Sequence, residues 1–388
     1  MNLVIVGEFD STNVGDQLIA QGQREIFAAC CERARLLPLE DGRSAAQLPE
    51  DRGRRESLPR RMHRTLYSRH VLYRHAVESM LHTRKNRLYR LHAEDTLAGA
   101  DGLIIGGGQL LSDGTLRMLR RLDALTEVAK ERGIPLAAFG TGMAQPRSGI
   151  SRTLIRRILH RLDGPNFFRD ERSRRLALEL HQGIDLSPAP TPDCAIAGIA
   201  SKASLMESAF LVGVAPMAPA ILARSGLSTT GIDRWWMAVI EQLLERGESP
   251  VLFSTGVGLD ADYAKNLQGK LAARGRYIDV LDRPRCGEEL LGQLRHMKRV
   301  LAQRLHASIS YYALGGIPAS ATWDAKIDEF YASISLARRV IRPDKVDPEG
   351  TAHIVLSADR PDPEPMALAG RSMSDACLCV ARLAAGGA

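Results

Sequence analysis

The stretch Val300–His306 ends in the residue pair with the clearest chemistry in the sequence. An apolar run stops at Arg304, Leu305 and His306, and the residues that follow return to helical spacing. This pattern predicts the carboxyl end of a parallel strand that leads into a helix, the edge at which open α/β sheets bind ligands. Arg304 and His306 are two residues apart, so on an extended backbone their side chains would leave the same face. A fixed cation beside an imidazole suits an anionic substrate that must be protonated. The alternative is an ordinary solvated strand end.

A second polar loop lies near the start of the chain. The apolar run Leu3–Val6 is followed by Asn13-Val14-Gly15-Asp16, after which apolar residues recur at helical spacing. This is the order of a strand, a loop at the ligand edge and a helix. Gly15 would let the backbone approach a ligand that Asn13 and Asp16 contact. The alternative is that Asn13 or Asp16 only caps the helix.

The third loop contains three consecutive glycines, Gly106, Gly107 and Gly108, after an apolar run. Glycines have no side chains, so backbone amides there could face an anion at the N-terminus of the following helix. The alternative is a tight turn. The loop at Asn13 lacks the G-x-G-x-x-G spacing of a dinucleotide fingerprint. We therefore expect ligand contacts at both loops and no dinucleotide cofactor.

Strand and helix patterns alternate through both halves of the chain, which predicts two α/β domains with parallel sheets. We expect an N-terminal Rossmann-like domain at residues 1–200 and, after a small polar linker at 198–208, a C-terminal Rossmann-like domain at 209–345. The tail at 346–388 has a helical pattern and could pack back on the first domain. Two doubly wound domains that face each other across a cleft would resemble the GT-B glycosyltransferases.

Length and composition fit this organisation. A chain of 388 residues with 45% hydrophobic and 25% charged residues suits two soluble domains. No apolar run approaches the roughly 20 residues that span a bilayer. The sequence starts directly in a strand pattern without a basic leader, so we expect a cytoplasmic protein. The six cysteines include no C-x-x-C pair and no neighbouring histidine cluster, so we predict no metal site.

Residues 51–92 differ from the rest of the chain in charge. They contain twelve basic and three acidic residues, a difference of plus nine, while the whole chain has a formal charge of plus seven. Apolar residues recur there at helical intervals, which predicts a basic helical insertion with one apolar side. A solvated helix packed on the first domain is one interpretation. Docking to an anionic membrane surface is the second. Nucleic acid is the third, but no recognised binding motif accompanies the charge.

Five ordered segments resemble the polysaccharide pyruvyl transferase family. They are N-x-G-D at 13–16, D-x-x-x-x-G-G-G at 101–108, R-D-E-x-S at 169–173, P-D at 192–193, and R-L-H at 304–306 with a following G-x-P and Lys326. None of these segments is specific alone, but their order and spacing are. The resemblance spans residues 13–326.

The resemblance implies transfer of the pyruvyl group of phosphoenolpyruvate to two hydroxyls of a sugar, which gives a ketal and inorganic phosphate. The acceptor would be a polysaccharide or a lipid-linked glycan, the C-terminal domain would bind the donor, and no cofactor would be needed. His306 would be the general acid, because protonation at C3 makes C2 open to attack by a hydroxyl. Arginine forks bind carboxylate and phosphate groups, so Arg304 and Arg169 would hold the donor. The other expected substrate-binding residues are Asn13, Asp16, Gly106, Gly107, Gly108, Asp193 and Lys326.

Two other classes of function fit the same sequence. A GT-B-type glycosyltransferase that uses a nucleotide sugar would have the same architecture. A non-catalytic carbohydrate-binding protein would release no phosphate. The expected location is the cytoplasm, with peripheral contact at the inner face of the membrane if the acceptor is lipid-linked.

Overall fold

The chain folds into two compact units, each built around one parallel β-sheet. Unit 1 comprises residues 1–11, 23–193 and 371–388, and unit 2 comprises residues 12–22 and 194–370. The computed structural model describes residues 1–9, 13–39, 71–83, 85–114, 116–202, 204–224, 228–359 and 362–386. The sequence placed the change of domain at 198–208, whereas this division falls after Asp193, and residues 12–22 group with the second unit.

The sheet of unit 1 has five strands in the order β2-β1-β3-β4-β5, and all neighbouring strands are parallel. Its order reverses between β1 and β3, the position at which doubly wound sheets bind ligands outside the carboxyl ends of their strands. Strands β3 and β4 are buried along their whole length, as expected for a sheet that helices cover on both faces. The strands are β1 (Asn2–Gly7), β2 (Arg33–Pro38), β3 (Gly102–Gly106), β4 (Leu136–Thr141) and β5 (Phe167–Phe168).

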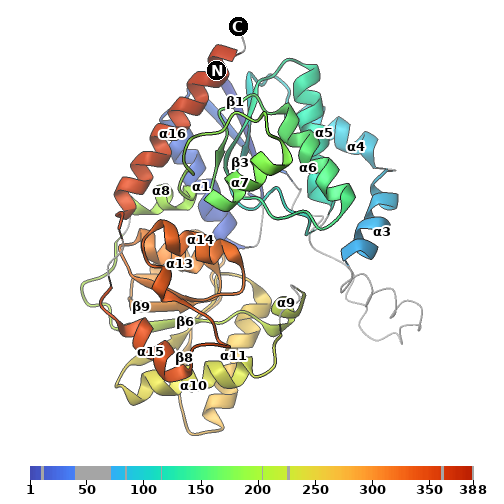
Figure 1. The fold of residues 1–388 in the computed structure, drawn as a ribbon. Helices are drawn as coiled ribbons and strands as arrows, with labels where there is room; N and C mark the ends of the chain where they lie inside the picture. Colours follow the sequence, from blue (N-terminus) through green and yellow to red (C-terminus); the bar gives the residue numbers. More distant parts are fainter. Residues whose placement is uncertain are drawn as a thin grey trace. The chain divides into compact units, whose positions relative to one another are not determined.

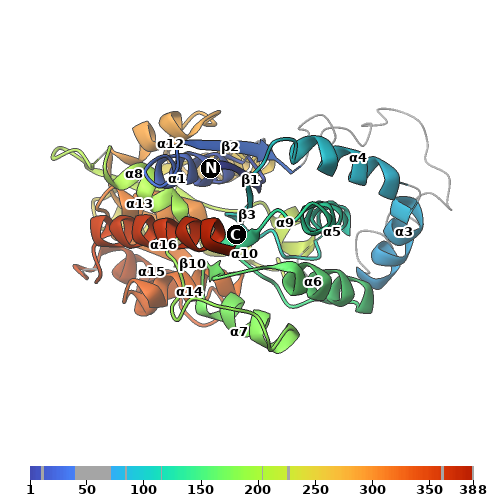
Figure 2. The ribbon, with the colours of Figure 1, turned by 90° about the horizontal axis from the view of Figure 1, so that it is seen from above.

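Helices cover both faces of this sheet. Val4 and Val6 of β1 share a core cluster with Leu119 of α5 and Ile155 of α6, and Figure 1 shows α1 and α16 on the opposite side of the sheet. Helices α3 and α4 lie at the border of the unit next to α5, as the view from above also shows (Figure 2). The helices are α1 (Val14–Ala28), α3 (Val71–Thr83), α4 (Asn86–Thr96), α5 (Leu116–Glu131), α6 (Gly149–Arg161), α7 (Glu171–Leu180) and α16 (Pro365–Gly386).

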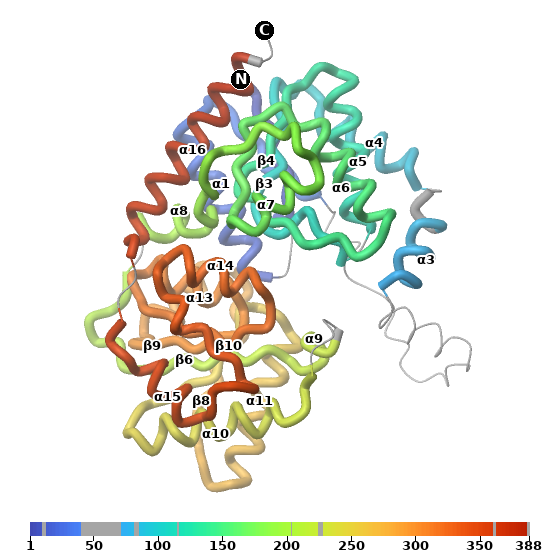
Figure 3. Tube along the Cα trace, in the orientation of Figure 1, coloured from blue at the N-terminus to red at the C-terminus, as the bar shows by residue number. Residues whose placement is uncertain are grey.

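Unit 2 contains a six-stranded parallel sheet with the order β11-β10-β9-β6-β7-β8. Figure 3 traces the chain of this unit as a tube, with β6, β8, β9 and β10 labelled. The chain starts this sheet at β6, adds β7 and β8 on one side, and returns to add β9, β10 and β11 on the other. The reversal therefore lies between β6 and β9. The strands are β6 (Leu211–Ala215), β7 (Ser249–Leu252), β8 (Asp279–Val280), β9 (Met297–Ala302), β10 (Pro318–Ala321) and β11 (Val340–Ile341).

The helices of unit 2 include one that the sequence did not predict. The start of the expected linker at 198–208 belongs instead to α8, which is buried and packs against α13. A Cβ atom on Gly198 would lie 2.9 Å from the backbone nitrogen of Gly22, so α8 and α1 cross with their backbones in contact. The helices are α8 (Cys194–Ala200), α9 (Pro219–Arg224), α10 (Ile232–Glu245), α11 (Gly258–Ala272), α12 (Gly287–Leu294), α13 (Leu305–Ala313), α14 (Ala325–Ser333), the short η1 (Ala337–Arg339) and α15 (Pro348–Leu356).

Among the described residues, no helix is both long enough and apolar enough to cross a bilayer.

Candidate active site

The junction between β9 and α13 carries the predicted Arg304 and His306. The expected order of strand and helix is confirmed, because β9 ends at Ala302 and α13 begins at Leu305. Arg304 immediately precedes the helix with φ −82° and ψ 124°, and His306 lies in its first turn. The prediction that both side chains leave one face of an extended strand is therefore wrong, because the helix already begins between them.

Gln303 fixes this junction at the reversal point of the sheet. Its backbone N–H donates to the carbonyl of Ala215 at 3.0 Å, and its side-chain oxygen accepts the N–H of Met217 at 2.7 Å. The buried amide therefore joins the segment after β9 to the segment after β6. Arg304 follows directly, so its backbone position is set by the two central strands.

A buried carboxylate holds the side chain of Arg304. Its Nε donates to Oδ2 of Asp260 at 2.8 Å, and the other carboxylate oxygen accepts the backbone N–H of Ala218 at 2.8 Å. Asp260 is only 1% exposed, while the Arg304 side chain is 21% exposed. Within the described residues the two terminal nitrogens of Arg304 have no partner. The guanidinium is thus anchored at one nitrogen and can still bind an anion in a fork.

The imidazole of His306 lies against the first turn of α1. A Cβ atom on Gly15 would come within 2.4 Å of both Cγ and Nδ1 of the ring, so glycine is needed for this approach. Asn13 stands before the helix, and its Oδ1 accepts the N–H of Gly15 at 3.2 Å. Asn13 thus makes the capping contact that we considered as the alternative role. Asp16 lies in the same first turn.

Three helices begin close together at this edge: α1, α11 and α13. Besides the contact of α1 with His306, the N–H of Val14 points to the carbonyl of Thr255 at 3.4 Å, in the loop before α11. The N-terminus of a helix carries partial positive charge and unsatisfied amides, so three such ends favour an anion. Asp16 and Asp260 lie in two of these first turns, but Asp260 is already paired with Arg304.

The loop after β7 was missed by sequence reasoning. Ser254 and Thr255 are buried, and among the residues described their hydroxyl oxygens have no hydrogen-bond partner. Gly256 follows with φ +92°, and its carbonyl accepts from Nε of Arg283 at 2.7 Å. The sequence S-T-G-V-G between a strand and a helix could have indicated this loop, but such small polar residues also occur in ordinary turns.

Lys326 reaches the same edge of unit 2 from α14. Its ammonium lies 5.0 Å from the ring centre of Trp323, and 3.8 Å from a carboxylate oxygen of Asp324. The indole N–H of Trp323 donates to the carbonyl of Gln303 at 2.7 Å, next to Arg304. The structure therefore groups five of the predicted residues in unit 2: Asn13, Asp16, Arg304, His306 and Lys326.

The glycine loop of unit 1, Gly106 to Gly108, is hydrogen-bonded to the end of β4. Gly107 and Gly108 have φ values of +71° and +68°, which glycine tolerates without strain. The N–H of Gly107 donates to the carbonyl of Phe139 at 3.0 Å, and the carbonyl of Gly108 accepts the N–H of Gly142 at 2.7 Å. The next helix, α5, begins only at Leu116. The loop is therefore a turn bonded to the end of β4, which matches the alternative of a tight turn.

Arg169 lies beside this loop with two carboxylates. Its side chain is 7% exposed, with nitrogens 3.6 Å from Oδ2 of Asp170 and 3.6 Å from Oδ2 of Asp193. A Cβ atom on Gly142 would lie 2.8 Å from one of its terminal nitrogens. This balanced arrangement suits an internal ion-pair network better than the expected anion clamp. The predicted residues of unit 1 are Gly106, Gly107, Gly108, Arg169 and Asp193.

Two parallel-sheet α/β units, with polar residues gathered at the carboxyl ends of their strands, define a protein of GT-B-like fold. The chain belongs to the polysaccharide pyruvyl transferase family, whose family model matches residues 13–310. This match includes Arg304 and His306 but ends before Lys326.

Solved structures are also similar to this chain. The UDP-GlcNAc 2-epimerase of Methanocaldococcus jannaschii is 10% identical with a TM-score of 0.54, and the alignment covers 97% of this chain and 98% of that chain. The heptosyltransferase WaaC of E. coli, with ADP-2-deoxy-2-fluoro heptose, is 14% identical with a TM-score of 0.39 over 83% of this chain and 88% of that chain. No curated protein sequence matches the chain. At these identities the epimerase supports the fold alone.

Proposed function

We propose that this protein transfers the pyruvyl group of phosphoenolpyruvate to two hydroxyls of one sugar in a polysaccharide or a lipid-linked glycan. The products are a pyruvate ketal and inorganic phosphate. Membership of the family supports a transferase that acts on polysaccharides. The observation that carries the donor assignment is Arg304, anchored to buried Asp260 beside His306 at the reversal point of the unit 2 sheet.

The edge of unit 2 suits a donor with two anionic groups. The terminal nitrogens of Arg304 can bind the carboxylate or the phosphate in a fork. The amides at the starts of α11 and α13, together with the hydroxyls of Ser254 and Thr255, provide donors for the other group. Asn13, Asp16 and Lys326 then line the surroundings of the donor rather than bind a cofactor. The reaction needs none, because anion binding and proton transfer are sufficient.

His306 is the proposed general acid. It gives a proton to C3 of the donor, which becomes a methyl group, and positive charge develops at C2. A sugar hydroxyl adds to C2 and loses its proton. The C2–O bond to phosphate then breaks, the electron pair leaves with the phosphate, and a second hydroxyl adds to C2 with loss of its proton. Arg304 stabilises the anionic groups through these steps.

Unit 1 is assigned to the acceptor. Gly106, Gly107 and Gly108 present a backbone without side chains, which leaves room for a sugar, and Asp193 supplies a hydrogen-bond acceptor for its hydroxyls. Arg169 holds Asp193 in place through their ion pair. Because a lipid-linked acceptor lies at a membrane, we place the reaction in the cytoplasm with peripheral contact at the inner membrane face.

Phosphate release tests this function. The purified protein is incubated with phosphoenolpyruvate and a panel of glycan and lipid-linked acceptors, and parallel samples receive nucleotide sugars instead. We expect phosphate release only when phosphoenolpyruvate and a suitable acceptor are both present, together with a product heavier by one pyruvyl ketal. Transfer of sugar from a nucleotide sugar, without phosphate release from phosphoenolpyruvate, would establish the glycosyltransferase alternative.

A further inference from the structure

Helices α3 and α4, which lie at the border of unit 1 (Figure 2), carry several exposed apolar side chains. The structure describes ten large hydrophobic side chains as exposed, and four of them belong to these two helices. They are Leu72 at 67%, Met80 at 76%, Leu88 at 62% and Leu91 at 51% exposure. We define these four residues as the α3–α4 apolar face. Such a concentration of exposed apolar side chains marks an interaction surface rather than random scatter.

The inner side of α3 shows that this exposure is fixed by the fold. His75 is buried, with ring nitrogens 2.8 Å from Oγ of Ser148 and 2.9 Å from the carbonyl of Asp113. Buried Glu78 accepts the N–H of Leu116 at 2.6 Å, at the start of α5. These polar contacts orient α3 on the unit. Leu72 and Met80, eight residues apart on the other side of the helix, must therefore point outward.

Helix α4, which carries Leu88 and Leu91, also lines a hollow of about 460 Å³. Its lining includes four arginines: Arg87 and Arg90 from α4, Arg120 from α5 and Arg157 from α6. Asp123 and Glu127 also line it, so the formal charge of the lining is four minus two, or plus two. Arg87 and Arg120 have no carboxylate partner within the described residues. The hollow thus retains cationic groups that can bind phosphate.

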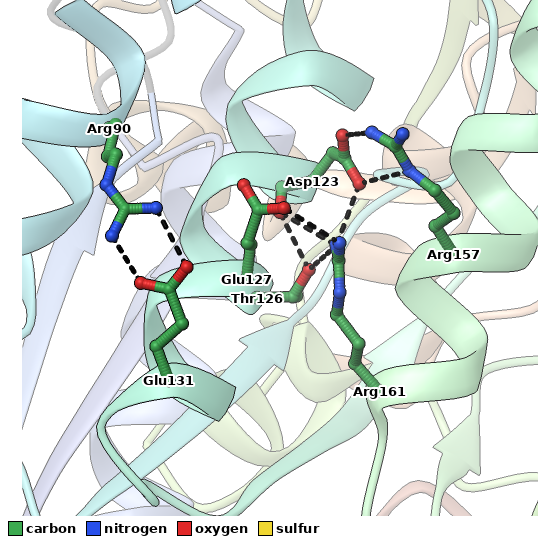
Figure 4. Close-up of polar contacts among 7 residues, drawn as sticks. All are labelled: Arg90, Asp123, Thr126, Glu127, Glu131, Arg157 and Arg161. Carbon is green, nitrogen blue, oxygen red and sulfur yellow. Dashed lines mark hydrogen bonds and ion pairs between the residues drawn. The ribbon is translucent and has the colours of Figure 1, made fainter. Parts of the chain in front are cut away.

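Figure 4 shows how carboxylates hold the remaining arginines of this region in place. Asp123 accepts from Nε of Arg157 at 3.0 Å and from Arg161 at 2.8 Å, while Glu131 accepts from Arg90 at 2.9 Å. Burial, and then the nearby Arg161 and Arg120, lower the pKa of the Arg157 guanidinium. Because these guanidinium groups repel one another, an additional anion would stabilise their charged forms.

We propose that the α3–α4 apolar face and the arginine hollow dock the protein on an anionic phospholipid bilayer. The leucines and the methionine enter the boundary between head groups and acyl chains, and the arginines bind lipid phosphates. Nucleic acid would use the arginines but would leave the four apolar side chains in water. This docking surface specifies the peripheral membrane contact included in the proposed function, but its existence does not depend on pyruvyl transfer.

Vesicle flotation of the full-length protein tests the proposal. The probes are vesicles of phosphatidylcholine alone and vesicles that also contain phosphatidylglycerol. We expect binding to the anionic vesicles at low salt and release as salt rises, because ions screen exposed charges beyond about 10 Å at 0.1 M. No binding at low salt, or equal binding to both vesicle types, would overturn the proposal.

Matched variants identify the surface. Leu88→Gln with Leu91→Gln, and separately Arg87→Gln, should each reduce vesicle binding several-fold. Met366→Gln and Arg285→Gln change an exposed apolar and an exposed cationic residue elsewhere, and should bind as the wild type does. Equal losses in the controls would contradict the assignment. Binding of a DNA oligonucleotide that needs Arg87 but not Leu88 would show that nucleic acid is the partner instead.

A soluble acceptor separates this inference from the proposed reaction. The Leu88→Gln, Leu91→Gln variant should release phosphate from phosphoenolpyruvate at the wild-type rate when the acceptor is soluble. Loss of vesicle binding with retained turnover therefore supports docking as a separate property. Vesicle binding by a protein without any turnover would leave the docking face established and the proposed reaction refuted.

Discussion

The carboxyl edges of the two sheets differ in how their cations are balanced. In unit 2, Arg304 has one buried carboxylate partner and lies where three helices begin, and buried hydroxyls without described partners lie nearby. In unit 1, Arg169 faces two carboxylates, and the amide of Gly107 is bonded to its own chain. The carboxyl edge of unit 2 can therefore attract an anion. At the carboxyl edge of unit 1, the cation and the Gly107 amide already have partners within the protein. This difference supports our proposal that the anionic donor binds in unit 2.

The largest expected effect follows removal of the proton donor in unit 2. His306→Gln keeps a polar side chain of useful size but cannot transfer a proton. We expect donor binding to persist while phosphate release falls by about 10²- to 10⁴-fold. Turnover and the thermal midpoint should be measured on the same sample, because a structural histidine would lower stability instead. Near-wild-type turnover in a well-folded variant would refute the general-acid assignment.

A smaller loss is expected when the imidazole is displaced rather than removed. In Gly15→Ala the new Cβ would lie 2.4 Å from the ring of His306, so the ring must move. Displacement of a catalytic group by about 1 Å can cost up to 10²-fold in turnover. The control is Gly292→Ala in α12, where a Cβ meets no atom within 4 Å. If the two variants turn over equally, the contact between Gly15 and His306 has no role in the reaction.

The two arginines provide the most direct contrast between the units. Arg304→Ala removes a charge-assisted contact to the donor, so calorimetry should show affinity for phosphoenolpyruvate about tenfold weaker or more. Arg169→Ala leaves two carboxylates without their cation, which should cost roughly 3 kcal/mol of stability and lower the thermal midpoint. Donor affinity should change little in the folded fraction of this variant. Weaker donor affinity in Arg169→Ala together with unchanged donor affinity in Arg304→Ala would instead assign the donor to unit 1.

The smallest effect concerns a buried thiol of unit 1. Burial raises the pKa of Cys379 to about 12, with a further contribution from Asp375. Above about pH 8.5 the unfolded thiol loses its proton while the folded one keeps it, so stability should fall as pH rises, by at most about 1.4 kcal/mol per pH unit. Cys379→Ala should flatten the dependence of the thermal midpoint on pH between 8.5 and 10 relative to exposed Cys377→Ala. Parallel curves would contradict this assignment.

Much of the fold was predictable because buried parallel strands leave clear apolar runs. Leu3–Val6 and the run before Gly106 both form strands with loops at the expected edge. The start of α13 was not predictable, because Arg304 is not a typical capping residue and makes no side-chain capping bond. Without that boundary, the sequence suggested an extended backbone as far as His306.

Partners distant in sequence account for the remaining differences. Asp260 lies 44 residues before Arg304, and no local pattern links them. Likewise, residues 198–200 were assigned to the linker at 198–208 because they are small, but they belong to α8, where Gly198 allows close packing on α1. The sequence therefore suggested the candidate residues. Only the fold showed that Arg169 is paired with two carboxylates and Arg304 with one.

Hydrogen–deuterium exchange with and without phosphoenolpyruvate tests the donor assignment most directly. If the donor binds in unit 2, exchange should slow in the loop from Ser254 to Val257 and in the first turn of α13, because the ligand covers these amides. The same protection should disappear in Arg304→Ala, while the loop from Gly106 to Gly108 remains unchanged in both proteins. Protection confined to the glycine loop of unit 1 would contradict the account.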